Sequence, residues 1–187
     1  MVLGDDRLPT LTAARVSLRW LELADVPALF TLFSDPEVAR FWSSPAMTAL
    51  GQAQRLLAQI HNGYARGDLL QWGIEHDGAI IGTCTLSHVE VDHRRAEVGF
   101  ALARNRWGQG LAREAVSRLL GFAFGPLALH RLEADVDPRN ARSLGLLASL
   151  GFRREGLLRE RWHVAGEICD AVFLGLLARD FEAHSAV

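Results

Sequence analysis

The chain contains no lysine, and all 20 of its Lys/Arg positions are arginine. This absence excludes every mechanism that needs a lysine amine, including Schiff-base catalysis. The charge is also close to balanced, with a formal net charge of -2 at pH 7 and a pI near 6.4. Because nucleic-acid binding usually requires a concentrated basic face, we expect no nucleic-acid partner.

Cysteine is scarce as well, with only Cys84 and Cys169. Neither belongs to a spaced pair typical of a zinc site or a disulfide framework, and we expect both to be buried thiols. The spacing of four histidines is not that of metal ligands either: His88, His93, His130 and His163. We therefore expect no metal.

Long apolar runs are missing. The longest, from Leu119 to Leu129, is interrupted by two glycines and a proline and is too short to span a bilayer. Residues 1–6 are acidic and lack the apolar core of a secretion signal. We expect a cytoplasmic protein with no membrane partner. Its 187 residues, 49% of them hydrophobic, predict a single domain over residues 1–187 with a core from about 10 to 180.

The most informative stretch of the chain is a strand, a glycine-containing loop and a helix within residues 97–118. Gly108 and Gly110 allow the backbone to approach a ligand closely. The free N–H groups of a helix that starts at Leu111 attract phosphate. The stretch therefore predicts an anion-binding loop, followed by a helix in which Glu114 and Arg118 are spaced to pair.

Other glycine loops fit this stretch less well. A mononucleotide-binding loop needs Gly-Lys-Ser/Thr after its last glycine, whereas Leu111-Ala112-Arg113 follows Gly110. A dinucleotide-binding turn requires a third glycine where Arg113 stands, and a strand near the start of the chain. A tight turn that binds no ligand is the remaining alternative.

Hydrophobic periodicity and turn residues predict the other elements. Asp77-Gly78 and Ala165-Gly166 mark two hairpins. Thr48 is expected to cap the second helix, and Asn140 the last. The predicted strands cover residues 16–21, 70–76, 79–88, 97–102, 131–136, 152–161 and 167–177. The predicted helices cover residues 26–34, 48–65, 111–124 and 140–151.

Residues 107–112 resemble the acyl-CoA pyrophosphate loop of the GNAT N-acetyltransferase superfamily, Gln/Arg-x-x-Gly-x-Gly/Ala, with Gly110 and Ala112 at the small positions. Trp107 replaces the usual Gln or Arg, which is similar to the branch of ribosomal-protein alanine N-acetyltransferases (RimJ/RimL-like). Further motifs follow in the order and spacing of that branch: Glu97-Val98-Gly99-Phe100, Asn140-x-x-Ser143, Gly151-Phe152, Gly156 and Gly166-x-x-x-Asp170.

The resemblance implies an α+β GNAT fold. Its central sheet is mostly antiparallel and twisted, with about seven strands flanked by about four helices, and the fourth and fifth strands splay apart. The cosubstrate would be acetyl-CoA, with its pantetheine arm in that gap. The implied cofactor contacts are Phe100, Ala101, Leu102, Arg106, Trp107, Gly108, Gln109, Gly110, Leu111, Ala112, Arg113 and Asn140.

The resemblance also implies catalytic roles. Glu97 is the preferred general base, with Glu160 or water alone as the alternatives, and either carboxylate could instead form a salt bridge or bind substrate. Ser143 would hydrogen-bond or protonate the departing sulfur, the alternative being a passive contact. A bulge near residues 98–99 would aim an N–H group at the thioester oxygen; otherwise Gly99 is a packing glycine.

The implied acceptor wall lies between the first two helices. Phe41 and Trp42 are its candidates, although an aromatic pair is more often part of a core. The expected reaction is transfer of an acetyl group to a primary amine, for example a protein N-terminus, by direct attack in a ternary complex. The alternatives are a small-molecule amine acceptor, such as an antibiotic, polyamine or amino-sugar, and a non-catalytic acyl-CoA-binding module. A homodimer is compatible with the resemblance.

Overall fold

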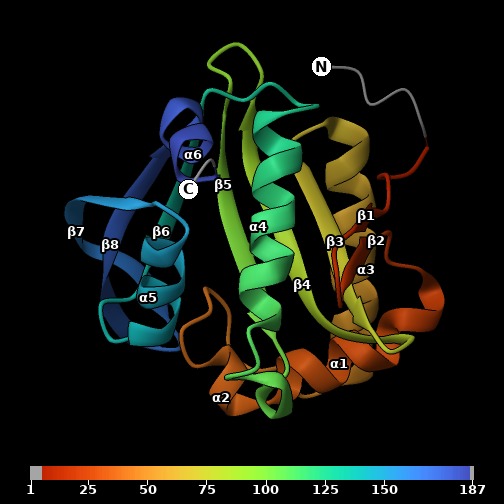
Figure 1. Ribbon diagram of the computed structural model, residues 1–187. Helices are drawn as coiled ribbons and strands as arrows, with labels where there is room; N and C mark the ends of the chain where they lie inside the picture. The colour runs from red at the N-terminus through yellow and green to blue at the C-terminus, as the bar shows by residue number, and fades with distance from the viewer. Residues whose placement is uncertain (1–5, 186–187) are drawn as a thin grey trace.

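A computed structural model describes residues 6–185, and its centre is one twisted sheet of eight strands with helices on both faces (Figure 1). The strand order is β1-β2-β3-β4-β5-β6-β8-β7, and every neighbouring pair is antiparallel except β5 and β6. The strands are β1 (Leu11–Thr12), β2 (Ser17–Arg19), β3 (Leu69–His76), β4 (Ala79–Glu90), β5 (Arg95–Leu102), β6 (Arg131–Val136), β7 (Arg153–Val164) and β8 (Glu167–Leu177).

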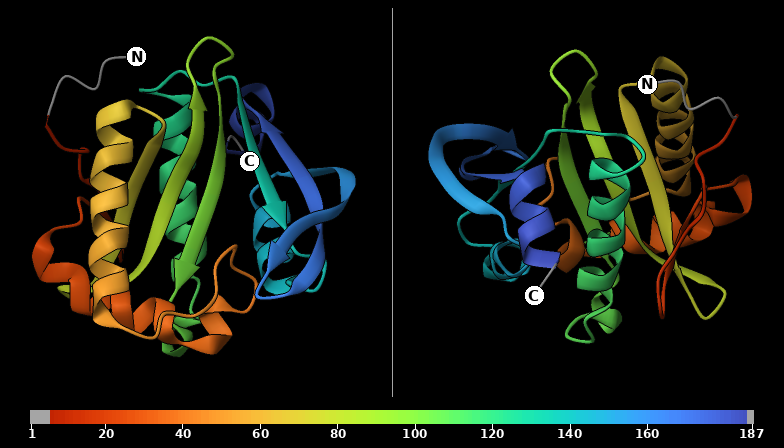
Figure 2. Two further views of the ribbon diagram at one scale, coloured as in Figure 1. Left: turned by 180° about the vertical axis from the view of Figure 1, so that it is seen from behind. Right: turned by 45° about the horizontal axis from the view of Figure 1, so that its top comes forward.

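Helices cover the two faces unequally. In Figure 1, α4 lies in front of β4 and β5, whereas α3 lies on the opposite face, as the rear view in Figure 2 shows. Each face has its own buried cluster, one around Trp72 and Leu119 and the other around Leu29 and Ile60. The helices are α1 (Val26–Ser34), α2 (Pro36–Ala39), α3 (Leu50–Arg66), α4 (Leu111–Phe124), α5 (Ala141–Ser149) and α6 (Ala178–Ser185).

The predicted fold class is confirmed, with small differences in the number of elements. The additional elements are the two-residue strand β1 and the helices α2 and α6. Thr48 as the cap of α3 is wrong: the N-cap is Ala49, and the Gln52 side-chain oxygen accepts the N–H groups of Thr48 (2.7 Å) and Ala49 (2.9 Å). Among residues 6–185, no helix is both long and apolar enough to cross a membrane.

The predicted parting of two central strands is also present. β5 and β6 pair only at Arg95↔Arg131, Ala96↔Leu132 and Glu97↔Glu133. Beyond Glu97, β5 stays paired with β4 as far as Leu102, while β6 stays paired with β8. The β6-facing edge of β5 therefore has no ladder partner from Val98 onward, and the two strands form a fork.

The bulge expected near residues 98–99 is wrong. Pairing between β4 and β5 is regular from Ser87↔Glu97 to Gly82↔Leu102, and the irregularity lies on β4 between Ser87 and Glu90. There two residues, His88 and Val89, stand opposite one residue of β5. His88 has a φ of +50°, a left-handed conformation that lets the strand absorb the additional residue.

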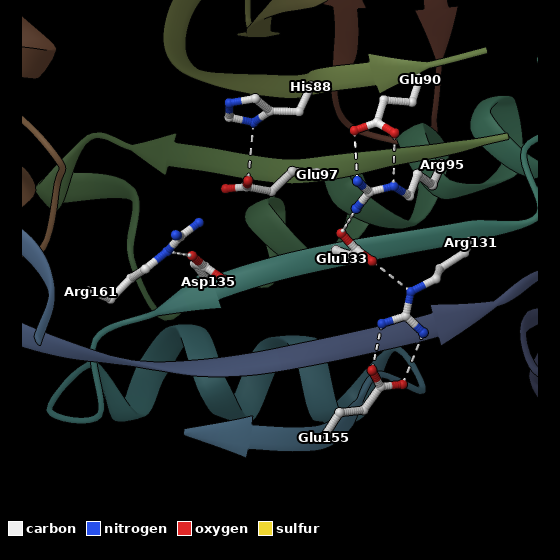
Figure 3. Close-up of polar contacts among 9 residues, drawn as sticks. All are labelled: His88, Glu90, Arg95, Glu97, Arg131, Glu133, Asp135, Glu155 and Arg161. Atoms are coloured by element: carbon white, nitrogen blue, oxygen red, sulfur yellow. Dashed lines mark hydrogen bonds and ion pairs between the residues drawn. The ribbon is translucent and has the colours of Figure 1, made fainter. Parts of the chain in front are cut away.

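A row of alternating charges crosses the closed end of the fork (Figure 3). Arg95 on β5 contacts Glu90 on β4 (2.6 Å) and Glu133 on β6 (2.8 Å). Arg131 contacts Glu133 (2.7 Å) and then Glu155 on β7. These pairs bridge β5 and β6 where their ladder persists, so the fork opens only at the other end.

Glycine at position 82 is required by the close approach of β4 to β5. A Cβ at Gly82 would overlap the carbonyl oxygen of Ala101. Gly82→Ala should lower the free energy of unfolding by about 2 kcal/mol, because one of two paired strands must move. Urea unfolding followed by circular dichroism measures this loss.

Gly145→Ala is the matched control for this prediction. Gly145 lies within α5, is exposed, and has open space where a Cβ would stand. Alanine should raise the unfolding free energy there by about 0.5–1 kcal/mol through helix propensity. Equal effects of the two substitutions would contradict the assigned clash.

Candidate active site

The glycine loop joins the open end of β5 to the start of α4. Gly108 and Gly110 have φ values of +75° and +77°, and Gly110 is the N-cap of α4. The N–H groups of the first helical turn have no partner within the helix, so this end carries partial positive charge. The Trp107 indole N–H donates to the carbonyl of Leu102 (2.7 Å), which ties the loop to the tip of β5.

Arg15, in the turn between β1 and β2, supports this loop and was not predicted from the sequence. Arg15 donates to the carbonyl of Gln109 (3.0 Å) and forms an ion pair with Glu114 (2.8 Å). The expected pairing of Glu114 with Arg118 is therefore wrong, because Arg118 donates to the Thr12 carbonyl. No local pattern marks Arg15, since its partners are more than 90 positions away.

A cavity of about 780 Å³ extends from the loop into the fork. It is lined by every predicted cofactor contact except Gln109, whose side chain instead donates to the Asn105 carbonyl. Arg106 and Arg113 both line it. Arg142, also on its wall, lies 4.7 Å from the centre of the Trp107 ring and was not predicted.

Asn140 and Ser143 line the same cavity from the start of α5. The Asn140 side-chain oxygen accepts the Ser143 N–H (3.1 Å), which confirms Asn140 as an N-cap. The Ser143 hydroxyl has no hydrogen-bond partner within residues 6–185. It is therefore available to a bound molecule.

A second cavity of about 560 Å³ adjoins the first. The two share Arg40, Phe41, Trp42, Phe100, Asn140 and Ser143. Trp42 also packs against Phe33, with ring centres 5.2 Å apart, so it belongs both to the cavity wall and to the core. Trp42 thus lines the cavity and packs in the core, whereas Phe41 lines the cavity and belongs to neither buried cluster. The acceptor role of this pair stays a prediction.

Two carboxylates lie in the second cavity on the parting strands, Glu97 on β5 and Asp135 on β6 (Figure 3). Glu97 contacts the Nδ1 atom of His88 (3.2 Å), and Asp135 forms an ion pair with Arg161 (2.9 Å). Burial, helped by the negative charge of Asp135, raises the pKa of Glu97, while His88 and Arg161 oppose that rise. Glu97 is thus a stronger base than an exposed glutamate.

The remaining carboxylates of the second cavity are Asp137, Glu167 and Asp170. Arg139 neutralises the first two, with contacts of 2.6 Å to each. Asp170 accepts the backbone N–H of Glu160 (2.8 Å). The carboxylates are therefore largely paired within the protein.

Two residues, Glu160 and Cys169, differ in the structure from what the sequence predicts. Glu160 is exposed on β7, with a φ of +54°, and lines neither cavity. Cys84 is buried, as expected, but Cys169 is only partly buried and lines the second cavity. In the described part of the chain, no group of three or more His, Cys, Asp or Glu side chains could hold a metal ion.

The first cavity has two features that an acyl-CoA would use. Gly108 has open space where a Cβ would stand, and both loop glycines adopt conformations that L side chains rarely adopt, so the loop backbone is accessible beside a positive helix end. The unpaired edge of β5 then offers backbone groups to an amide-containing arm. The cavity thus offers a positively charged loop to an anion and an unpaired strand edge to amide groups.

Comparison with known proteins agrees with these two features. A profile described as "Acetyltransferase (GNAT) domain" matches residues 15–153. The uncharacterized N-acetyltransferase p20 of Bacillus licheniformis is 36% identical over 176 residues, which are 93% of this chain and 99% of that protein. Spermidine N(1)-acetyltransferase of Escherichia coli K12 is 27% identical over 92% of this chain and 91% of its own length.

Among solved structures, Mycobacterium smegmatis RimJ in complex with CoA-disulfide superposes with a TM-score of 0.84. It is 26% identical, and the match covers 95% of each chain. The glycine loop, the fork and the relatives all indicate the same cosubstrate. The chain therefore belongs to the GNAT acetyltransferase family and is an acetyl-CoA-dependent N-acetyltransferase.

Proposed function

We propose that the enzyme acetylates the N-terminal amine of a peptide or protein by direct attack in a ternary complex, within one catalytic domain. The observation that carries this proposal is the junction of the two cavities at Phe100, Asn140 and Ser143, with Glu97 in the second cavity. A thioester in the fork and an amine in the second cavity would meet there. Holding both reactants together removes most of the entropic cost of their encounter.

The cosubstrate side uses mainly backbone groups. The loop from Trp107 to Ala112 would hold the diphosphate, assisted by Arg106 and Arg113. The free edge of β5, at residues 100–102, would bond the pantetheine amides. Bound in this way, acetyl-CoA supplies an activated acetyl group.

Proton movement is assigned to two side chains. Glu97 would accept a proton from the incoming ammonium group, directly or through one water molecule, because its raised pKa makes it a competent base. Ser143 would donate a hydrogen bond to the departing sulfur, since its hydroxyl has no partner in the described protein. Glu160, exposed and outside both cavities, is not supported as the base.

The charge balance of the second cavity favours an acceptor with a single positive charge. Arg161 pairs with Asp135, Arg139 pairs with Asp137 and Glu167, and His88 contacts Glu97. A polyamine with several ammonium groups would need several unpaired carboxylates. An α-amine, with a pKa of roughly 7.7–8.0 against about 10.4 for an alkylamine, is also easier for Glu97 to deprotonate.

A polyamine is the second candidate, because Asp170 has only a backbone partner and the spermidine acetyltransferases resemble this chain over most of its length. An acceptor panel measured by CoA thiol release decides between them. Peptides with a free N-terminus should show kcat/KM about tenfold above spermidine, and the same peptides with acetylated N-termini should show no turnover.

Two results of this panel would contradict the proposal. Preference for spermidine would assign the polyamine acceptor. Tight acetyl-CoA binding without thiol release on any amine would instead indicate a non-catalytic module.

The loop assignment predicts a specific effect at Gly108. Gly108→Ala should weaken CoA binding about tenfold, equivalent to about 1.4 kcal/mol, because a methyl group would stand between the backbone and the diphosphate. Isothermal titration calorimetry with CoA measures this effect.

Gly78→Ala is the matched control for Gly108→Ala. Gly78 has the same φ of +75° and equally open surroundings, but it lies in the β3–β4 turn and lines neither cavity. Both substitutions should lower the free energy of unfolding by about 1–2 kcal/mol. Only Gly108→Ala should also weaken CoA binding. Equal CoA affinity in the two variants would contradict the loop assignment.

The assignment of Glu97 predicts a pH-dependent defect. Glu97→Gln should lower kcat about 100-fold near pH 7, while the KM for acetyl-CoA stays within about twofold. The loss should shrink above about pH 9, where a peptide α-amine is already neutral in solution.

Glu160→Gln is the control for Glu97→Gln, and it should change kcat less than about twofold. Rate profiles from pH 6 to pH 10 measure both variants. A pH-independent defect in Glu97→Gln, or a larger defect in Glu160→Gln, would overturn the assignment of the base.

A further inference from the structure

We propose that His88 carries the proton from Glu97 to solvent during each turnover. This inference rests on the proposed role of Glu97 as the base. It concerns a step that the reaction requires, because a carboxyl group that has taken a proton from one ammonium must lose it before the next acceptor arrives.

The bulge in β4 places His88 in the second cavity. Along β4, Cys84 and Leu86 point into the core, and regular alternation would send residue 88 in the same direction. Instead Val89 takes the core position, while His88 lines the cavity together with Thr85 and Ser87. Bulges redirect side chains in this way.

The backbone conformation of His88 is unfavourable for a residue with a side chain. Its φ of +50° costs on the order of 1 kcal/mol relative to regular strand geometry. The surrounding strands must compensate for that cost. What the bulge provides is contact between this imidazole and Glu97.

The imidazole bridges the carboxylate and bulk water. Its Nδ1 atom lies 3.2 Å from Glu97, whose side chain is only 27% exposed, while the His88 side chain is 74% exposed. Within residues 6–185, the His88 Nε2 atom has no hydrogen-bond partner in the protein. The two ring nitrogens of a histidine can accept and donate protons in turn, so His88 connects the base to water.

No other charged group around Glu97 offers an exit. Asp135, across the fork, is 3% exposed and paired with Arg161. The other charged groups of the cavity wall are Arg40, Asp137, Glu167 and Asp170. Asp137 and Glu167 are held by Arg139, and Asp170 accepts a backbone N–H from β7.

The transfer balances in two steps. Beside ionised Glu97, the neutral ring of His88 carries its proton on Nδ1 and donates it to the carboxylate. Once Glu97 is protonated, exchange with solvent at the exposed ring gives the Nε2–H tautomer, in which Nδ1 can accept. The O–H bond of Glu97 then breaks as that proton bonds to Nδ1, and the Nε2–H bond of the resulting imidazolium breaks as a water molecule or a buffer base takes the second proton. The ring again carries its proton on Nδ1, as at the start.

The test variant is His88→Asn, because asparagine tolerates a positive φ and does not titrate near neutral pH. In a dilute, bulky buffer its kcat should fall about tenfold, with the KM for acetyl-CoA unchanged. Added imidazole should restore kcat in a saturable manner, because a small diffusing base replaces the missing one. CoA affinity and circular dichroism should match the wild type.

Two controls make the result specific. His93→Asn removes an exposed histidine from the adjacent β4–β5 turn, outside both cavities, and should leave kcat and its imidazole dependence unchanged. Glu97→Gln should not respond to imidazole, because the base itself is absent.

Two outcomes would overturn the relay. One is a wild-type kcat for His88→Asn in dilute buffer, and the other is a loss of kcat that imidazole does not restore. Either result, with Glu97→Gln still defective, rejects the role of His88 and leaves Glu97 as the base. Full activity in Glu97→Gln would instead reject the proposed function on which the relay rests.

Discussion

Two parallel strands that share only three residue pairs are the feature on which the site depends. β5 and β6 are held together at Arg95 to Glu97 and are separate beyond that point. The ion-pair row from Glu90 to Glu155 bridges the paired end. Such pairs contribute little individually when exposed, but here they form a connected network with members on β4, β5, β6 and β7. The gap between β5 and β6 is therefore part of the fold itself.

Charge is arranged differently at the two ends of this fork. At the closed end each carboxylate contacts arginine, which suits a permanent structural connection. At the open end, Asp135 is paired in the same way, but Glu97 contacts a histidine instead. An arginine at position 88 would hold Glu97 ionised and lower its affinity for a proton. The neighbour of Glu97 is thus one that can itself gain and lose a proton.

Much of the fold could be predicted because local patterns determine it. The helix α4, the N-cap Asn140 and the two hairpin turns follow from periodicity and turn chemistry. The fork was predicted only through the resemblance, because which parallel strands separate depends on long-range packing. The contacts of Arg15 and Arg142 join distant segments and leave no local signature.

The bulge was predicted on the wrong strand because the resemblance to the family implied it at residues 98–99 of β5. The relevant signal is a change in apolar spacing on β4, where Cys84 and Leu86 are two apart but Val89 follows after three. That change of phase marks the extra residue. The contribution of Gln52 at the start of α3 was not predicted, because its side chain reaches back from the first turn to the N–H groups of Thr48 and Ala49.

The hydrogen bond from Trp107 to Leu102 has a consequence for acyl-chain length. It joins the loop and the tip of β5 into one unit, so the distance between a diphosphate on the loop and a thioester in the fork is set by the protein. With the thioester in the fork and the amine in the second cavity, as proposed, each methylene added to the acyl group would extend past Phe100 toward the amine. A longer donor and a bulky acceptor would then compete for the same volume, whereas a short donor would leave room for a bulky acceptor.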